Sequence, residues 1–282
     1  MEDAGTHPED QDPHVARRHC PIPGPRTGHH RGPGAAQQPV PGGTRGHRGV
    51  SPVLVFVHGA GATGRVWQSQ LLDFPQSRAP DLPGHPAGRL LATVEAYAAW
   101  LLDDLRASGS LHPVLVGHSM GGAVALHAAL AAPQQLSGLV LVGTGPRLRV
   151  NPKFLQGLVH TPHATLDRFV ELCFGPHAPE RVKAKVLESA RHLGPEVLRQ
   201  DLEACNAFDV TGRLEEVRLP TLVVCGERDV MTPPALSAEL HAGIRGSTLV
   251  VVPEAGHMVF AERRRLFRDT VRTFLKQLAA RG

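Results

Sequence analysis

The sequence predicts an α/β fold with a mostly parallel, doubly wound sheet and a helical insertion. From residue 53 onward, short apolar runs alternate with stretches of helical periodicity. Strands that lack polar alternation are buried on both faces, as in a parallel sheet covered by helices. Residues 146–217 break this rhythm, because they contain helical stretches but no convincing strand. Strand–helix alternation outside this segment is typical of an open α/β sheet.

The expected elements follow one another in a simple order. Strands are predicted at 53–57, 114–116, 139–142, 222–225 and 249–252, with a thin one within 73–81. Helices are predicted at 94–105, where Thr93 is the expected N-cap, at 120–132 and at 267–278. Within the insertion, helical stretches lie at 154–159, 166–174, 182–187 and 197–208.

The segment 1–49 differs in composition from the rest of the chain. It holds eight Pro, nine Gly and six His, but no Leu, Phe, Tyr or Trp. Such a segment cannot bury enough apolar surface to offset the entropy of ordering, so we predict a disordered tail. The predicted organisation is therefore a tail (1–49), a core in two pieces (50–145 and 218–282) and a helical cap (146–217).

The bulk properties exclude several classes of protein. In 282 residues, 41% are apolar, which suffices for one large domain or a domain with an insertion. A net charge of +4 without a dense Lys/Arg cluster argues against nucleic-acid binding. No apolar stretch reaches the ~18 residues of a membrane span, and no secretory signal is visible. Four cysteines without a CxxC pair favour a reducing compartment, so we predict a cytoplasmic location. The sequence does not indicate an oligomeric state.

A nucleophile is predicted at Ser119. It lies at the centre of Gly117-His118-Ser119-Met120-Gly121, a G-x-S-x-G motif between an apolar run and a stretch of small residues. This strand–turn–helix context is what a nucleophile elbow requires. The two glycines remove side chains that would collide at a strained turn.

A serine hydroxyl needs a base, and the base needs an orienting acid. His257 follows the last apolar run, and Asp229 follows the run before it. Parallel strands bring their carboxyl ends to one edge of the sheet, where sites form. Glu227 is a rival acid, but Asp229 stands further past the strand end, where the loop can turn toward His257. The backbone N–H groups of Ala60 and Met120 are the expected oxyanion donors.

Five motifs together make the chain resemble the α/β-hydrolase fold family over about residues 50–282. They are HGAG at 58–61, DLPGH at 81–85, GHSMGG at 117–122, GERD at 226–229 and AGHM at 255–258. Two further motifs, FD at 208–209 and TPP at 232–234, are similar to those of small esterases, enol-lactonases and carbon–carbon bond hydrolases. Members of this family usually begin with an antiparallel strand pair, and residues 1–49 show no such pattern.

The expected function is that of a serine hydrolase that cleaves a small to medium hydrophobic carboxylic ester through an acyl-enzyme. The reaction needs a small-molecule substrate but no cofactor and no metal. Candidate side chains for an acyl pocket are the cap phenylalanines Phe154, Phe169, Phe174 and Phe208.

Two alternatives stay open. The same triad supports lactone opening, acyl transfer or carbon–carbon bond hydrolysis. The last needs polar cap groups for a second substrate oxygen, for which the candidates are His160, His163, Arg168 and Asn206. The second alternative, from another class of function, is a non-catalytic receptor for a small ligand on the same scaffold.

Overall fold

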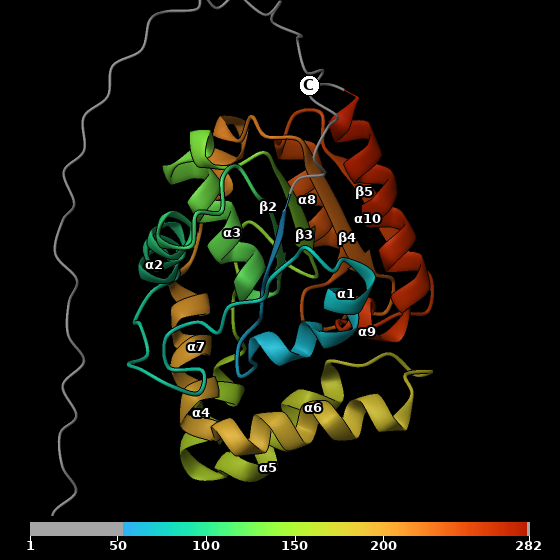
Figure 1. Ribbon diagram of the computed structural model, residues 1–282. Helices are drawn as coiled ribbons and strands as arrows, with labels where there is room; N and C mark the ends of the chain where they lie inside the picture. Colours follow the sequence, from blue (N-terminus) through green and yellow to red (C-terminus); the bar gives the residue numbers. More distant parts are fainter. Residues whose placement is uncertain (1–52, 281–282) are drawn as a thin grey trace, which may run out of the picture. The chain divides into compact units, whose positions relative to one another are not determined.

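A computed structural model of the chain describes residues 53–280. They form a five-stranded parallel sheet with helices on both faces, which confirms the predicted fold class (Figure 1). The predictions for residues 1–49, a disordered tail and the lack of an initial strand pair, lie outside the described residues.

The five predicted apolar runs are confirmed as strands, and they lie side by side in sequence order. They are β1 (Leu54–Val57), β2 (Val114–His118), β3 (Gly138–Val142), β4 (Thr221–Gly226) and β5 (Thr248–Val252). The register pairs Val57 with Gly117 and His118 with Val142. The carboxyl ends of neighbouring strands are therefore aligned at one edge of the sheet.

Two layers of helices cover the sheet. The helices of these layers are α1 (Gln68–Asp73), α2 (Val94–Ala107), α3 (Met120–Ala131), α8 (Pro234–Gly243), α9 (Val259–Glu262) and α10 (Arg264–Ala279). One hydrophobic cluster joins the sheet to α2, α3 and α8, and a second joins it to α1, α9 and α10. Short 3₁₀ turns lie at Gly64–Trp67, Pro133–Gln135 and Thr211–Glu216.

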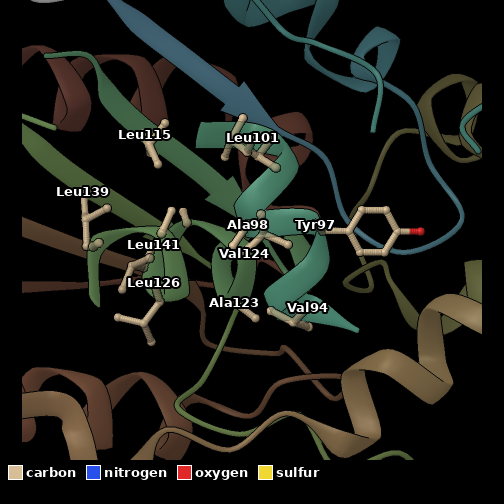
Figure 2. Close-up of a cluster of buried hydrophobic side chains, with 14 of the residues drawn as sticks. Val94, Tyr97, Ala98, Leu101, Leu115, Ala123, Val124, Leu126, Leu139 and Leu141 are labelled. Atoms are coloured by element: carbon tan, nitrogen blue, oxygen red, sulfur yellow. The ribbon is translucent and has the colours of Figure 1, made fainter. Parts of the chain in front are cut away.

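Strand residues alternate between the two clusters. Val55 and Val57 belong to the cluster beneath α2 and α3, whereas Leu54 and Phe56 belong to the other. Figure 2 shows the first cluster, in which side chains of α2 and α3 meet those of β2 and β3. Each fully buried large apolar side chain of this kind contributes about 1.5–3 kcal/mol. The continuous apolar runs of the sequence therefore fill both layers.

The first residues of α2 confirm the predicted N-cap. The hydroxyl of Thr93 accepts a hydrogen bond from the backbone N–H of Ala96 at 3.1 Å. This bond satisfies one of the N–H groups that lack a partner in the first turn of a helix.

Two expectations for the strands are corrected. β5 is an edge strand rather than a strand buried on both faces, and 43% of the Val251 surface is exposed. The segment 73–81 forms a single parallel bridge, in which Arg78 pairs with Val55 beside β1. Its backbone accepts from Phe56 N–H at 2.9 Å and donates to the Leu54 carbonyl at 3.1 Å. One large apolar residue in this segment is too little to build a longer strand.

Four helices separate β3 from β4 and gather at one end of the sheet (Figure 1). They are α4 (Pro152–His160), α5 (Pro162–Leu172), α6 (Glu180–Leu193) and α7 (Pro195–Ala207). Each overlaps one of the helical stretches predicted within residues 146–217. No helix among residues 53–280 combines the length and the apolar character needed to span a bilayer.

Candidate active site

The turn after β2 holds Ser119 in a strained conformation, with φ 55° and ψ −120°. Residues other than glycine rarely adopt a positive φ, and the cost is of order 1–3 kcal/mol. Hydrogen bonds on both sides maintain the turn: Ser119 N–H donates to the Val142 carbonyl at 3.0 Å, and the Thr144 hydroxyl donates to the Ser119 carbonyl at 2.8 Å. The sheet and the loop after β3 thus fix the serine backbone.

The glycines of the G-x-S-x-G motif are required by close backbone approach. A Cβ atom on Gly117 would lie 2.2 Å from the Gly121 carbonyl oxygen. A Cβ atom on Gly121 would lie 2.3 Å from the Val57 carbonyl oxygen at the end of β1. Any side chain at either position would push the turn away from the sheet.

His257 and Asp229 meet beyond the ends of β5 and β4. Nδ1 of His257 lies 2.8 Å from Oδ2 of Asp229, and both residues are buried. The other carboxylate oxygen, Oδ1, accepts from the backbone N–H groups of Met231 and Thr232 at 2.9 Å each. The carboxylate therefore faces the ring in a fixed orientation, in which Oδ2 accepts a hydrogen bond from Nδ1–H of His257.

The charge of Asp229 suits this contact. Burial alone raises the pKa of its carboxyl group, but the facing His257 ring and the hydrogen bonds from Thr232 outweigh burial and lower the pKa below its usual value. Glu227, the rival acid, is exposed and accepts from Glu254 N–H at 3.2 Å. The structure thus brings Asp229, and not Glu227, to the histidine.

Thr232 was not identified from the sequence as a site residue. Its hydroxyl donates to Asp229 Oδ2 at 2.9 Å and lies 3.2 Å from Nδ1 of His257. The threonine opens the TPP motif, but the motif alone does not reveal that its hydroxyl touches two members of the site.

His118 supports His257 rather than competing with it. Its Nε2–H donates to the His257 carbonyl at 3.1 Å, and the two ring centroids lie 4.5 Å apart. Burial, together with the neighbouring His257, lowers the pKa of His118 well below its usual value, so the ring stays neutral.

The predicted oxyanion donors lie on two segments that meet at the serine. A Cβ atom on Gly59 would lie 3.1 Å from Cβ of Ser119, so the loop after β1 packs directly against the elbow. Ala60 follows in this loop, and Met120 is the first residue of α3. The N–H of Met120 is one of the first-turn donors that have no partner within a helix. The two predicted donors therefore belong to the loop that packs against the elbow and to the N-terminus of α3.

Ser119 and His257 line one partly enclosed cavity of about 40 Å³. The cap contributes an apolar wall to it. The lining residues of the cap are Phe169, Val170, Cys173, Val186, Ala190 and Leu198. Those of the core are Gly59, Ala60, Gly61, Ala62, Val66, His118, Ser119, His257 and Met258. A larger open hollow of about 610 Å³ lies between β5 and α10 and includes none of the three predicted catalytic residues.

Of the four candidate phenylalanines, only Phe169 is among the residues lining this cavity. Phe154 packs edge-on against the Phe169 ring at 6.2 Å. Phe174 is partly buried and its backbone adjoins Gly256, whereas Phe208 is fully buried in the cluster beneath α2 and α3. The other cap residues that line the cavity are aliphatic or sulfur-containing, and the sequence prediction named only aromatic side chains.

The polar cap candidates for a second substrate oxygen do not line the cavity. His160, His163 and Arg168 are exposed. Asn206 is partly buried, and its side-chain carbonyl accepts from Val150 N–H at 3.0 Å. The geometry therefore gives no support to carbon–carbon bond hydrolysis that uses these groups.

Comparisons with known proteins agree with this architecture. The model of the Alpha/beta hydrolase family matches residues 54–270. Pimeloyl-[acyl-carrier protein] methyl ester esterases are 30% identical over 234 residues in Aromatoleum aromaticum and 27% over 240 residues in Neisseria meningitidis. The alignments cover 74% and 79% of this chain and 92% of each relative. The structure of a thermophilic esterase superposes with a TM-score of 0.73 at 32% identity, covering 80% of this chain and 90% of the other. The enol-lactonase from Burkholderia xenovorans shares the fold, with a TM-score of 0.75 at 24% identity, covering 82% and 93%.

Proposed function

Since the chain belongs to the Alpha/beta hydrolase family, we propose that it is a serine esterase in which Ser119, His257 and Asp229 act as the catalytic triad. The chain is an enzyme, and the names of its esterase relatives support a carboxylic ester as the substrate. One observation carries the mechanism: Asp229 contacts Nδ1 of a histidine that lines the same cavity as the elbow serine.

The proposed reaction begins when Nε2 of His257 takes the proton of the Ser119 hydroxyl. The serine oxygen attacks the ester carbonyl, and the negative oxygen that forms is stabilised by the N–H groups of Ala60 and Met120. The tetrahedral intermediate collapses, and His257 returns the proton to the leaving alcohol. Water then attacks the acyl-enzyme by the same route and releases the acid. Asp229 keeps the proton on Nδ1, so that Nε2 is free to accept another.

We further propose that the cap, residues 146–217, restricts the acyl group to a short apolar chain. The cavity beside Ser119 and His257 is small, about 40 Å³, and cap side chains form its apolar wall. The cap residues around it are apolar, so they favour a hydrocarbon chain and offer no partner to a charged one.

The test is a series of nitrophenyl esters from acetate to decanoate, combined with labelling by a fluorophosphonate. We expect kcat/KM to be highest for acyl chains of two to four carbons, and label to appear on the wild type but not on Ser119→Ala. Undiminished turnover by Ser119→Ala would rule out the triad. A steady rise of kcat/KM up to decanoate would rule out the short acyl pocket, and binding without any turnover would favour a receptor.

A further inference from the structure

We propose that Asp201 of the cap is a positioning residue for catalysis, because it holds the loop that carries the oxyanion donor Ala60. This inference rests on the proposed serine-esterase function and assigns part of the oxyanion machinery to helix α7. The cap then does more than enclose the acyl group.

Asp201 is completely buried in α7, and both of its oxygens have partners. Oδ2 accepts from the backbone N–H of Gly61 at 2.8 Å and from Nε2 of His85 at 2.8 Å. Oδ1 accepts from the Tyr97 hydroxyl at 3.3 Å. Three separate segments of the core thus converge on a single cap carboxylate.

The partners of His85 indicate that the buried pair is ionic. Its Nδ1 faces the carbonyls of Leu82 and Pro83, at 3.3 and 3.1 Å, and its Nε2 faces Asp201. Both ring nitrogens therefore face acceptors, which favours the doubly protonated ring. Burial lowers the pKa of His85, but the hydrogen bond and charge of Asp201, with the two carbonyls, outweigh burial and raise it. The histidine supplies the positive charge that a buried carboxylate requires.

Tyr97 completes the set as a donor. Its hydroxyl points away from the aliphatic cluster of α2 and α3 (Figure 2) and reaches Asp201. Burial and the nearby carboxylate raise the pKa of the phenol, so it keeps its proton. The carboxylate is therefore held on two sides by the core, which fixes the oxygen that Gly61 contacts.

The bond to Gly61 fixes the oxyanion loop at its far end. At its near end, Gly59 packs against the Ser119 side chain. Gly61 has a left-handed φ of +61°, and a Cβ atom there would lie 3.1 Å from Leu198 of the same helix α7. Ala60 lies between these two contacts. The Ala60 N–H keeps its direction only while Gly59 and Gly61 are both held in place. Asp201 supplies the polar contact at Gly61.

The experiment compares three variants of the full chain. Asp201→Leu keeps the branched shape of the side chain but has no acceptor, and its methyl groups are larger than the carboxylate oxygens. Asp201→Asn keeps an acceptor for Gly61 N–H and removes the charge. Leu202→Ala, the next residue of α7, is the matched control, because Leu202 is buried in the second hydrophobic cluster and does not line the cavity. Turnover of a short nitrophenyl ester is divided by the number of sites that a fluorophosphonate labels at completion, so that misfolded protein is not counted.

We expect Asp201→Leu to lower kcat about 10- to 100-fold, below the 10²–10³-fold loss typical of removing an oxyanion donor outright. KM should change less than about twofold, because the acyl wall stays in place. Asp201→Asn should recover most of kcat, and Leu202→Ala should lower the melting temperature without changing kcat per site.

Equal kcat per labelled site in Asp201→Leu and Leu202→Ala would overturn the inference, as would an Asp201→Asn variant as damaged as Asp201→Leu. If Asp201→Leu does not fold, hydrogen exchange of the Gly61 amide in the wild type decides. Slow exchange supports the bond, and exchange at the rate of a free peptide contradicts it. Failure of the esterase proposal itself looks different, because the wild type would then show neither turnover nor label.

Discussion

Replacing Asp229 by asparagine is the sharpest test of the proposed triad. Oδ1 of Asp229 accepts from the backbone N–H groups of Met231 and Thr232, whereas Oδ2 faces Nδ1 of His257 at 2.8 Å. An asparagine carbonyl can replace Oδ1 without disturbing either backbone bond. Its NH₂ group then takes the place of Oδ2, and a donor faces the histidine where an acceptor stood.

The size of the effect follows from the proton on His257. An NH₂ group opposite Nδ1 requires Nδ1 to accept, which moves the ring proton to Nε2. In that tautomer Nε2 cannot take the proton of Ser119. The equivalent exchange in serine proteases lowers kcat by about 10⁴. At 1.36 kcal/mol per tenfold change, this corresponds to about 5.5 kcal/mol of lost transition-state stabilisation.

Glu227→Gln is the matched control, because Glu227 carries the same charge two residues away but lies exposed beside Glu254. Steady-state turnover of nitrophenyl acetate should fall about 10⁴-fold in Asp229→Asn and stay near the wild-type value in Glu227→Gln. The melting temperatures of both variants show whether the fold is intact. A folded Asp229→Asn variant within tenfold of wild-type kcat would refute the tautomer mechanism, and a damaging Glu227→Gln would reverse the assignment of the acid.

Two further outcomes follow from the cavity and from a buried carboxylate. Ala190 lines the cavity, so Ala190→Leu should lower kcat/KM on butyrate more than on acetate. At about 0.8 kcal/mol per methylene, the difference should be roughly fourfold per carbon in the ester series. Equal losses on both esters would contradict the assignment of Ala190 to the cavity wall. Glu262 is buried and accepts from Gly256 N–H and Gly175 N–H at 3.1 Å, and burial raises its pKa despite these bonds. Because the pKa of Glu262 is raised in the folded state, wild-type stability falls as pH rises above about 4.3, the usual pKa of glutamate. The melting temperature of Glu262→Gln should therefore rise relative to that of the wild type between pH 4 and pH 7. A constant difference across this range would mean that the carboxyl group does not titrate there.

The sheet and the positions of the three proposed catalytic residues were predictable, because both depend on local signals. An apolar run marks each strand, and Ser119, Asp229 and His257 each follow one. Parallel pairing then brings the strand ends together without further information. Glu227 and Asp229 both follow β4 within a few residues, and a buried hydrogen bond to His257 separates their roles.

The contacts made by the cap were not predictable in the same way. Asp201 lies 140 residues from Gly61 in sequence, and their bond depends on how α7 packs on the loop after β1. One local signal existed, since Asp201 falls within the apolar stripe Leu198, Leu202 and Cys205, where a charge must have a buried partner. The partner itself is determined by tertiary packing, as is the apolar wall that α5, α6 and α7 contribute to the small cavity.

The sequential order of the sheet also bears on biosynthesis. Ser119 follows β2, whereas Asp229 and His257 follow β4 and β5, with the whole cap in between. Translation at about 5–20 residues per second delivers the histidine on the order of ten seconds after the serine. Throughout that interval the nascent chain holds the proposed nucleophile without the proposed base. The proposed esterase therefore stays inert on the ribosome until β5, among the last strands to be made, has joined the sheet.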